Sequence, residues 1–329
     1  MNYGRYYHRA TVLTNGKVLI TGGTNNGVNN YFNSAELYDP NTERWTFTAS
    51  MNNARSFHTS TLLNNGKVLV TGGYLGISGV IESTELYDLT SGSWTLTGNM
   101  NSARYGHTAS LLNNGKVLIA GGYNNGVLNT VELYDPSTGV WIAVANMNSA
   151  RCFHTASVLS NGKILVIGGD SLNSSFLRSS EIYDPSANTW TIQSGMHIAR
   201  TYHTASMLSN GKVLVTGGFN SQYLNTAELY DVSTNVWTKL NNINASRSFH
   251  PTFVLTNDRV FIIGGYGSNG VLNSTELYDP STSTWSLGPS MNTARVYHIA
   301  CKLTNGKILV AGGINQMAVT LNSAELYQT

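Results

Sequence analysis

Seven histidines share one position in a repeated motif, and each follows an arginine by three residues. A guanidinium is a permanent cation whose planar donors suit pairing with a carboxylate. A neutral imidazole can exchange hydrogen bonds or ligate a metal ion. The motif therefore allows two kinds of chemistry, buried ion pairing and metal binding. The pairs are Arg5 and His8, Arg55 and His58, Arg104 and His107, Arg151 and His154, Arg200 and His203, Arg247 and His250, and Arg295 and His298.

A glutamate recurs at a second position of the same repeat. Because each arginine has a matching glutamate, we expect the guanidinium groups to bond to these carboxylates or to loop carbonyls and to join neighbouring repeats. We expect each histidine to be a neutral ring that bonds the backbone. Residues that every repeat shares serve a need of every repeat, so this set predicts a structural ring. The glutamates are Glu36, Glu85, Glu132, Glu181, Glu228, Glu276 and Glu325.

Short β-strands must position these residues. Residues 58–63 and 66–73 are β-rich runs separated by Asn-Gly, which predicts a hairpin in which both turn residues have positive φ. The alternating residues 83–88 predict a third strand, and the segment around Trp94 predicts a fourth. The double glycine at 72–73 is expected to let backbone and aromatic rings approach closely.

This set of strands recurs along the whole chain. A small twisted sheet cannot bury both of its faces alone, so neighbouring sheets must stack around an axis. The pattern predicts an all-β fold, a seven-bladed β-propeller of four-stranded antiparallel blades, in a single domain of residues 1–329. The repeats begin near residues 5, 55, 104, 151, 200, 247 and 295.

The seventh repeat stops after Tyr327, before an Asp-Pro turn or a tryptophan strand. Residues 1–5 match residues 51–55, which follow a tryptophan strand, so they supply no replacement. Either a last strand has been removed from a longer chain, or the seventh blade has three strands. A three-stranded blade predicts an open edge at Ser323 to Tyr327, where another chain can pair.

Gly-Gly, Tyr-Asp-Pro and Trp, in this order and at a period near fifty residues, resemble the kelch repeat over the whole chain. The resemblance implies the β-propeller that forms the body of galactose oxidase-like proteins. Kelch propellers act as binding modules, scaffolds or enzyme bodies, so the resemblance alone does not assign a function. In kelch relatives, the loops between strands two and three and the entries to the innermost strands share the usual ligand face.

Aromatic side chains and asparagines are frequent at these positions in this chain. They can stack on and hydrogen-bond a sugar or a peptide, although loops also vary because they tolerate change. We therefore expect a non-enzymatic binding or scaffold module that recognises a protein segment or a glycan over the central axis. The predicted ligand-binding residues are Tyr6, Tyr31, Tyr74, Tyr105, Tyr123, Phe219, Tyr223 and Tyr266.

The alternative function is a copper- or other metal-binding propeller. In galactose oxidase, a Tyr-His pair within Arg-x-Tyr-His provides copper ligands, and the resemblance would assign this role to Tyr297 and His298 and to Tyr7 and His8. That family also needs a cysteine two residues after the arginine and a histidine from a separate domain. Here Cys152 follows its arginine by one residue. We therefore expect no cofactor, with copper as the alternative.

Composition excludes several other classes of function. Charged residues make up 11% of the chain and the net charge is +2, against about 25% charged residues in ordinary domains. This balance favours no nucleic-acid partner, and no apolar run is long enough for a membrane span. The localisation stays open. Without a signal peptide the chain as written would be cytoplasmic, and as a trimmed piece of a secreted protein it would be extracellular.

Overall fold

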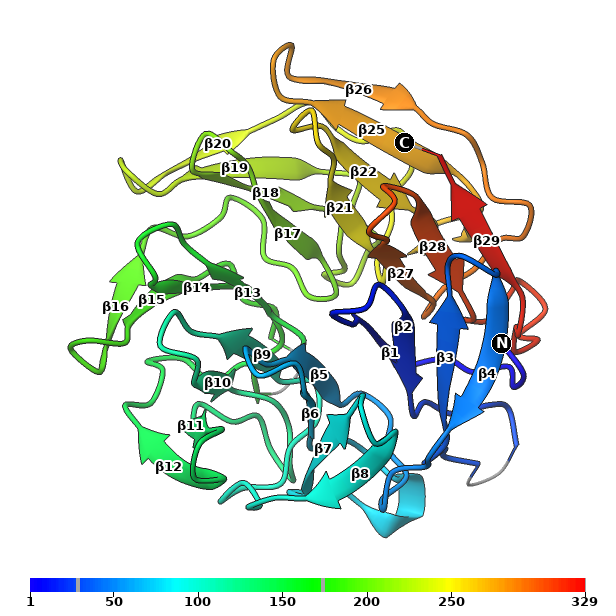
Figure 1. Cartoon of the computed structure of the whole chain (residues 1–329). Coiled ribbons are helices and arrows are strands. Elements are labelled where there is room, and N and C mark those ends of the chain that lie inside the picture. Colours follow the sequence, from blue (N-terminus) through cyan, green and yellow to red (C-terminus); the bar gives the residue numbers. More distant parts are fainter. Residues whose placement is uncertain (28–29, 173–174, 329) are drawn as a thin grey trace. The chain divides into compact units, whose positions relative to one another are not determined.

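The computed structural model describes residues 1–27, 30–172 and 175–328, and these residues form small antiparallel sheets (Figure 1). Six sheets have four strands each, and the sheet at the end of the chain has three. In every sheet the strands follow one another in sequence order. The chain is an all-β, seven-bladed β-propeller whose last blade has three strands, which confirms the predicted fold. No helix in the described residues is long and apolar enough to cross a membrane.

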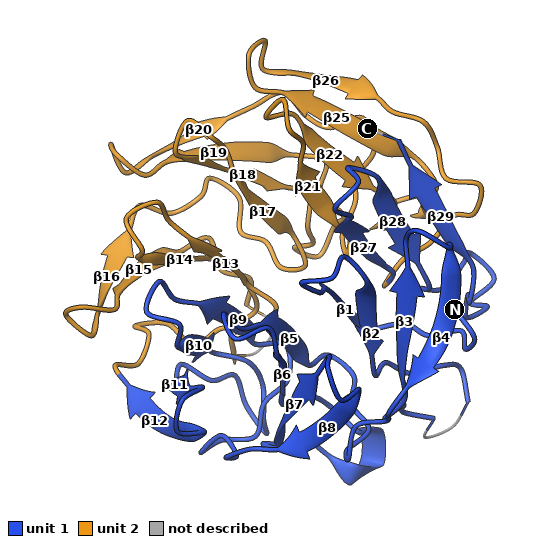
Figure 2. Cartoon of the chain, in the orientation of Figure 1, with its two compact units in different colours: residues 1–144, 298–329 blue, residues 145–297 orange. Residues whose placement is uncertain are grey.

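The chain divides into two compact units (Figure 2), unit 1 with Met1–Val144 and His298–Thr329, and unit 2 with Ala145–Tyr297. Unit 1 contains blades one, two, three and seven, and unit 2 contains blades four, five and six. The prediction of a single domain over residues 1–329 stays a prediction.

The strands of unit 1 are β1 (Arg9–Val12), β2 (Val18–Thr21), β3 (Ala35–Asp39) and β4 (Arg44–Thr48) in blade one, β5 (Thr59–Leu62), β6 (Val68–Thr71), β7 (Thr84–Asp88) and β8 (Ser93–Leu96) in blade two, β9 (Thr108–Leu111), β10 (Val117–Ala120), β11 (Val131–Asp135) and β12 (Val140–Val144) in blade three, and β27 (Ile299–Lys302), β28 (Ile308–Ala311) and β29 (Ala324–Tyr327) in blade seven. A 3₁₀ turn, η1, spans Gly76–Ser78.

The strands of unit 2 are β13 (Thr155–Val158), β14 (Ile164–Ile167), β15 (Ser180–Asp184) and β16 (Thr189–Gln193) in blade four, β17 (Thr204–Met207), β18 (Lys212–Thr216), β19 (Ala227–Asp231) and β20 (Val236–Lys239) in blade five, and β21 (Thr252–Val254), β22 (Val260–Ile263), β25 (Thr275–Asp279) and β26 (Thr284–Leu287) in blade six. Blade six also carries a short hairpin of β23 (Tyr266–Gly267) and β24 (Gly270–Val271).

The second strand of each blade forms the core. All four residues of β2, β6 and β10 are buried, and their sequences are runs of Val, Leu and Ile that end in Thr or Ala. Such a strand is apolar on both sides because a neighbouring blade covers each face of its sheet. In unit 1, for example, Val18 and Ile20 of blade one pack with Leu309 of blade seven. The outermost strands β4 and β8 are mostly exposed.

Both ends of the chain lie in unit 1. The innermost strand β27 of blade seven contacts β1 of blade one, and the Met1 ammonium donates to the Asn322 carbonyl at 2.8 Å. Strand β29 is the edge of the three-stranded sheet. Pairing of another chain with this edge, at Ser323 to Tyr327, stays a prediction.

The first hairpin of each blade differs from the predicted turn. In blade two, the Leu63 amide donates to the Lys67 carbonyl at 2.8 Å, and Gly66 alone is left-handed, with φ +81°. The loop therefore has three residues and closes with a glycine bulge. Asn65 contributes through its side chain, which accepts from the Lys67 amide at 3.1 Å. Where the glycine is replaced, Asp258 adopts the same conformation, with φ +63°.

The double glycines allow neighbouring groups to approach closely, as expected. In blade one, Gly22 has φ +59°, and a Cβ there would collide with the Arg55 carbonyl of blade two and with the His58 ring. The Gly23 amide donates to the same carbonyl at 2.8 Å. A backbone carbonyl and the imidazole ring of His58 therefore exclude side chains at Gly22, which confirms the expected close approach of backbone and an aromatic ring.

Tyrosine and tryptophan close the outer part of each four-stranded blade. Tyr134 is fully buried and its ring lies 5.0 Å from the ring of Trp141, which is 7% exposed. The Trp141 indole donates to the Gly98 carbonyl of the preceding blade at 2.7 Å. The same bond recurs from Trp94, Trp190, Trp237 and Trp285.

Replacing Trp141 with Ala is expected to lower the free energy of unfolding by about 3–5 kcal/mol, because a buried aromatic side chain leaves a cavity. Chemical denaturation measures this difference. The control is Leu96→Ala on the outer strand β8, where the side chain is 60% exposed and the change should stay within about 0.5 kcal/mol. Equal stability of the two variants would contradict the packing role of Trp141.

Candidate ligand-binding site

A buried ion pair holds the segment that enters each of blades one to six. Arg55 is fully buried and donates from Nη2 to Glu85 Oε1 at 2.7 Å, and from Nη1 to the carbonyls of Gly72 and Ser83. The other carboxylate oxygen accepts from the amide and the side chain of Asn52. The same set is found for Arg5 and Glu36, Arg104 and Glu132, Arg151 and Glu181, Arg200 and Glu228, and Arg247 and Glu276.

Each of these pairs lies within one blade, so it joins the incoming segment to the third strand of the same blade. The bond to the neighbouring blade is made by the arginine's carbonyl, as between Arg55 and Gly23. Burial raises the pKa of Glu85, but the hydrogen bonds from Asn52 and Asn53 and the Arg55 charge outweigh it and hold the pKa below its usual value. The glutamate is therefore ionised at neutral pH. Arg295 and Glu325 belong to different units.

Four of the histidines, His58, His107, His203 and His250, lie against threonine hydroxyl groups of the preceding blade. Nε2 of His58 is 2.8 Å from Thr21 Oγ1, and Nε2 of His203 is 3.0 Å from Thr155 Oγ1. Burial lowers the pKa of His203 to about 3, so this imidazole is neutral at pH 7. Threonine hydroxyls thus bond Nε2 of these rings where bonds to the backbone were expected, and Nδ1 of both rings lacks a partner at hydrogen-bonding geometry among the described residues.

The residue before each histidine has a left-handed backbone, and six of these seven residues are aromatic. A non-glycine residue in this region carries about 1–3 kcal/mol of strain. The strain places rings in contact, with centroids 3.7 Å apart for Tyr7 and Phe57 and 4.0 Å apart for Tyr202 and Phe249. The seven residues are Tyr7, Phe57, Gly106, Phe153, Tyr202, Phe249 and Tyr297.

Next to these residues, each blade presents a row of residues that lie side by side. In blade three, Tyr105 and Tyr123 exchange backbone hydrogen bonds of 3.2 and 2.9 Å, and Tyr123 bridges to Val127. Directly opposite residues of an antiparallel pair point to the same side, so a row presents its side chains together. We call the end of each unit that carries the rows its loop side.

The rows are Tyr6, Thr24 and Tyr31 in blade one, Ser56, Tyr74 and Val80 in blade two, Tyr105, Tyr123 and Val127 in blade three, Cys152, Asp170 and Phe176 in blade four, Thr201, Phe219 and Tyr223 in blade five, Ser248, Tyr266 and Val271 in blade six, and Ile314 and Thr320 in blade seven.

All eight predicted ligand-binding aromatics fall in these rows. In unit 1, ring centroids are 5.8 Å apart for Tyr31 and Tyr74, 5.2 Å for Tyr74 and Tyr105, and 5.6 Å for Tyr105 and Tyr123. Tyr6 contacts the ring of Tyr7 at 5.0 Å. The rings of unit 1 therefore form one continuous surface, and its role in binding stays a prediction.

In unit 2, Tyr223 contacts both Phe219 and Tyr266 at 5.1 Å. Sequence reasoning missed Phe176, whose ring lies 5.7 Å from that of Phe219. It belongs to a variable loop, 171–178, in which only backbone pairing identifies the residue that joins a row. The left-handed aromatics Phe57, Phe153, Tyr202 and Phe249 were also missed as surface residues, because αL geometry at an aromatic residue has no sequence signal.

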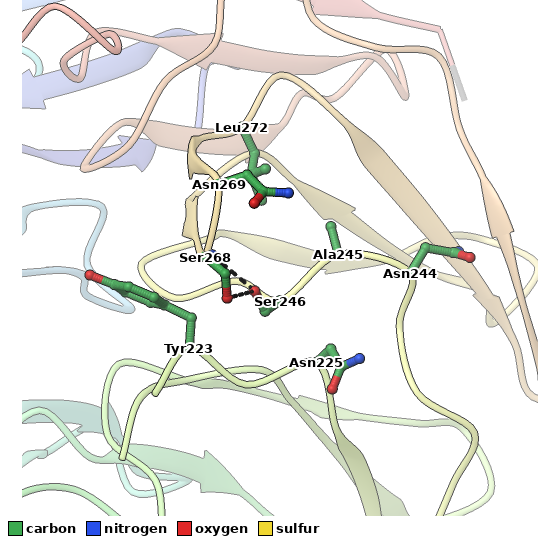
Figure 3. Close-up of a pocket in the computed structure, with 8 residues that line it drawn as sticks. All are labelled: Tyr223, Asn225, Asn244, Ala245, Ser246, Ser268, Asn269 and Leu272. Carbon is green, nitrogen blue, oxygen red and sulfur yellow. Dashed lines mark hydrogen bonds between the residues drawn. The ribbon is translucent and has the colours of Figure 1, made fainter. Parts of the chain in front are cut away.

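A cavity of about 360 Å³ opens in unit 2 beside the Tyr223 row (Figure 3). Its lining residues carry no charge, and the hydroxyls of Ser246 and Ser268 are joined at 2.9 Å. Asn225 also lines it. The equivalent amides of Asn33 and Asn273 donate to main-chain carbonyls, whereas the Asn225 side chain has no hydrogen bond in the described part of the chain. The lining consists of Tyr223, Asn225, Asn244, Ala245, Ser246, Ser268, Asn269 and Leu272.

Two family profiles cover the chain between them. The Attractin/LZTR1 beta-propeller matches residues 2–227, and the KLHDC2/KLHL20/DRC7 Kelch-repeats domain matches residues 153–329. The chain belongs to the kelch-repeat β-propellers. This confirms the resemblance that the repeats indicate, and kelch propellers typically bind other proteins. No curated protein sequence matches the chain.

Among solved structures, the kelch propeller is similar to a novel fungal alcohol oxidase of the AA5 family, in complex with copper. The TM-score is 0.81 at 18% sequence identity, over 95% of this chain and 71% of the oxidase chain. At this identity the likeness shows the fold alone. The oxidase's copper is therefore no evidence for copper in this chain.

The histidines of the proposed copper site, His8 and His298, belong to no cluster of three His, Cys, Asp or Glu side chains in the described residues. Across residues 1–27, 30–172 and 175–328, no three His, Cys, Asp or Glu side chains are placed to hold a metal ion. His8 is buried, and burial followed by the charge of Arg5 lowers its pKa well below its usual value. Blade seven has Ile299 and Ala311 at two positions where each of blades one to five has at least one threonine. Among the described residues, the His8 ring nitrogens therefore lack a partner at hydrogen-bonding geometry, although the Ala311 carbonyl is close enough to favour the protonated ring.

Tyr7, the other proposed ligand of this pair, stacks on Phe57. Tyr297 and His298 belong to different units. One neutral imidazole at His8 is thus available for a metal, and copper binding by these four residues stays a prediction.

Replacing Glu85 with Gln is expected to lower the free energy of unfolding by about 3–5 kcal/mol, because it leaves Arg55 buried without a counter-charge. The matched control is Asp88→Asn, which removes the exposed ion pair of Lys67 and Asp88 and should lower it by no more than about 1 kcal/mol. Urea denaturation at pH 7 measures both. Similar losses would show that the buried pair has no special role.

Proposed function

We propose that this kelch propeller is a non-enzymatic binding module that holds a segment of another protein against its loop side. The supporting observation is the continuous surface of partly exposed rings, of which Tyr31, Tyr74, Tyr105 and Tyr123 are the members in unit 1. Tyrosine rings supply large contact area with a polar end, and they are enriched at the centres of protein interfaces.

The residues that all repeats share and the row residues that vary have different roles, and this difference supports a binding function. The arginines and glutamates are enclosed in ion pairs, and most of the histidines bond threonines of the neighbouring blade, so these side chains maintain the blades. The rows differ from blade to blade, as recognition of an irregular ligand requires. Apart from Asp170, they contain no side chain that is charged at neutral pH, so contacts through stacking and hydrogen bonds should dominate.

A glycan is the second candidate ligand, and the neutral cavity in unit 2 favours it. Asn225 and Asn269 place amides in the cavity wall, Ser246 and Ser268 contribute hydroxyls, and Tyr223 adds an aromatic ring. Amides and hydroxyls can exchange hydrogen bonds with sugar hydroxyls, and an aromatic ring can pack against a sugar's apolar face.

A phage-displayed random peptide library and a glycan array, both screened with the same protein, separate the two ligand classes. We expect peptides to be selected. Tyr105→Ala should weaken a selected peptide at least tenfold, which corresponds to about 1.4 kcal/mol, whereas Phe47→Ala on the outer strand β4 should not. Affinity should change little between low and physiological salt. Glycan binding without peptide binding, or a steep loss of affinity with salt, would contradict the proposal.

Copper binding is the alternative function, and the neutral imidazole of His8 is the observation that favours it. Such a site would use imidazole and phenolate ligands from Tyr7, His8, Tyr297 and His298, which suit copper. The copper would supply one-electron oxidation, as in copper radical enzymes.

Elemental analysis after incubation with Cu²⁺ and gel filtration tests this alternative. We expect no stoichiometric copper and no visible absorption band. One copper per chain, lost in both His8→Gln and Tyr297→Phe variants that remain folded by circular dichroism, would establish the copper site and overturn the non-enzymatic assignment.

A further inference from the structure

Asp170 is the one row residue with an acidic side chain. The other rows hold Ser, Thr, Tyr, Phe, Val and Ile at the equivalent positions. Asp170 exchanges backbone hydrogen bonds of 3.0 and 2.8 Å with Cys152 and bridges to Phe176 on its other side. Its carboxylate therefore projects on the loop side of blade four, between a thiol and an aromatic ring.

No hydrogen-bond donor meets this carboxylate within the described residues. Oδ1 of Asp170 is buried and unpartnered, although the residue as a whole is partly exposed. The other aspartates each accept hydrogen bonds. Asp184, for example, accepts from the Ser186 amide and pairs with Lys163 at 2.9 Å, and Asp258 accepts from the Ser209 amide. A buried carboxylate without partners destabilises a fold, so a role in binding gives a reason for its presence.

The surroundings of Asp170 favour a cation. Burial raises the pKa of Cys152 to about 12, and the Asp170 charge adds to this, so the thiol is neutral and does not compete as an anion. Phe176 borders the carboxylate, and its ring meets that of Phe219 in a T-shaped contact. Aromatic faces attract ammonium and guanidinium groups, and more strongly where water is excluded.

The same rings lead from Asp170 to the neutral cavity. The step from Phe176 to Phe219 is 5.7 Å and the step from Phe219 to Tyr223 is 5.1 Å, and Tyr223 lines the cavity (Figure 3). Two such steps match about three residues of extended peptide at ~3.3 Å each. A peptide on this track can place a side chain at Asp170 and its backbone amides near the side chains of Asn225 and Asn269.

We propose that Asp170 is the counter-charge for a lysine or arginine side chain of the peptide, held beside Phe176, about three residues from a segment that occupies the Asn225 cavity. The inference rests on the proposed peptide-binding function and selects its ligand class. A metal ion is a poorer occupant, because one carboxylate supplies too few ligands for a hard cation.

Parallel selections from a random peptide library test this proposal. The wild type, Asp170→Asn and Asp184→Asn are screened together. Asp184→Asn makes the same change in net charge at a paired aspartate, the last residue of β15. We expect peptides selected by the wild type and by Asp184→Asn to share one basic position, and those selected by Asp170→Asn to lack it. A selected peptide should bind Asp170→Asn at least tenfold more weakly than it binds the wild type. A version of the peptide with norleucine in place of its basic residue should bind the two proteins equally.

Loss of folding does not explain such a result, because Asn is isosteric and removes a buried charge. Burial raises the pKa of Asp170 above its ordinary value of 3.8. The folded state therefore holds this proton more tightly, and the wild type loses stability as pH rises from 3.8 through the raised pKa. Asp170→Asn should accordingly be at least as stable as the wild type at pH 7 in chemical denaturation.

The possible outcomes distinguish failure of the proposed peptide binding from failure of the role assigned to Asp170. If the wild type selects no peptides, the proposed function fails. If it selects peptides that lack a common basic residue, or that bind Asp170→Asn equally well, peptide binding stands and the assignment of Asp170 is overturned.

Discussion

The fold depends on the buried pairing of one guanidinium and one carboxylate in blades one to six. Arg55 bonds Glu85 and two carbonyls with its fork of donors, and the remaining oxygen of Glu85 holds the segment that precedes the arginine. A pair of buried ions is stable only when nearly every donor and acceptor is satisfied. This requirement fixes the entry angle of the chain at each blade. It also fixes the carbonyl of Arg55, against which Gly22 and Gly23 of the neighbouring blade pack.

The fixed position of the segment that enters each blade also shapes the loop side. Between the arginine and the histidine, the chain must turn within two residues, and it does so through a left-handed residue such as Phe57 or Tyr202. The strain at these residues is held by the buried groups on both sides. The aromatic rings are thereby turned outward beside the rows, so a uniform interior supports a surface that differs in each blade.

The loop side of unit 2 shows how such a surface can be specific. Its contacts are mostly neutral, through the rings of Phe219 and Tyr223 and the amides of the cavity. In this setting a single carboxylate, that of Asp170, distinguishes the row of blade four from the others, and no donor in the described residues bonds to it. The blades of one propeller thus share a scaffold while the rows differ in chemistry.

The sequence by itself determined the seven repeats, their strands and the all-β fold, because strand alternation, turn residues and the double glycines are local signals. It also located the eight row aromatics, since they occupy fixed positions beside Arg and Gly-Gly. Only the tertiary structure decided that Asn65 stays outside the left-handed region, that Gly22 faces a carbonyl, and that Phe176 joins a row. Only the structure shows that no hydrogen-bond donor in the described residues reaches Asp170. These properties depend on which backbone groups come into contact across strands and blades. Such contacts join residues far apart in the sequence, so no local pattern of residues predicts them.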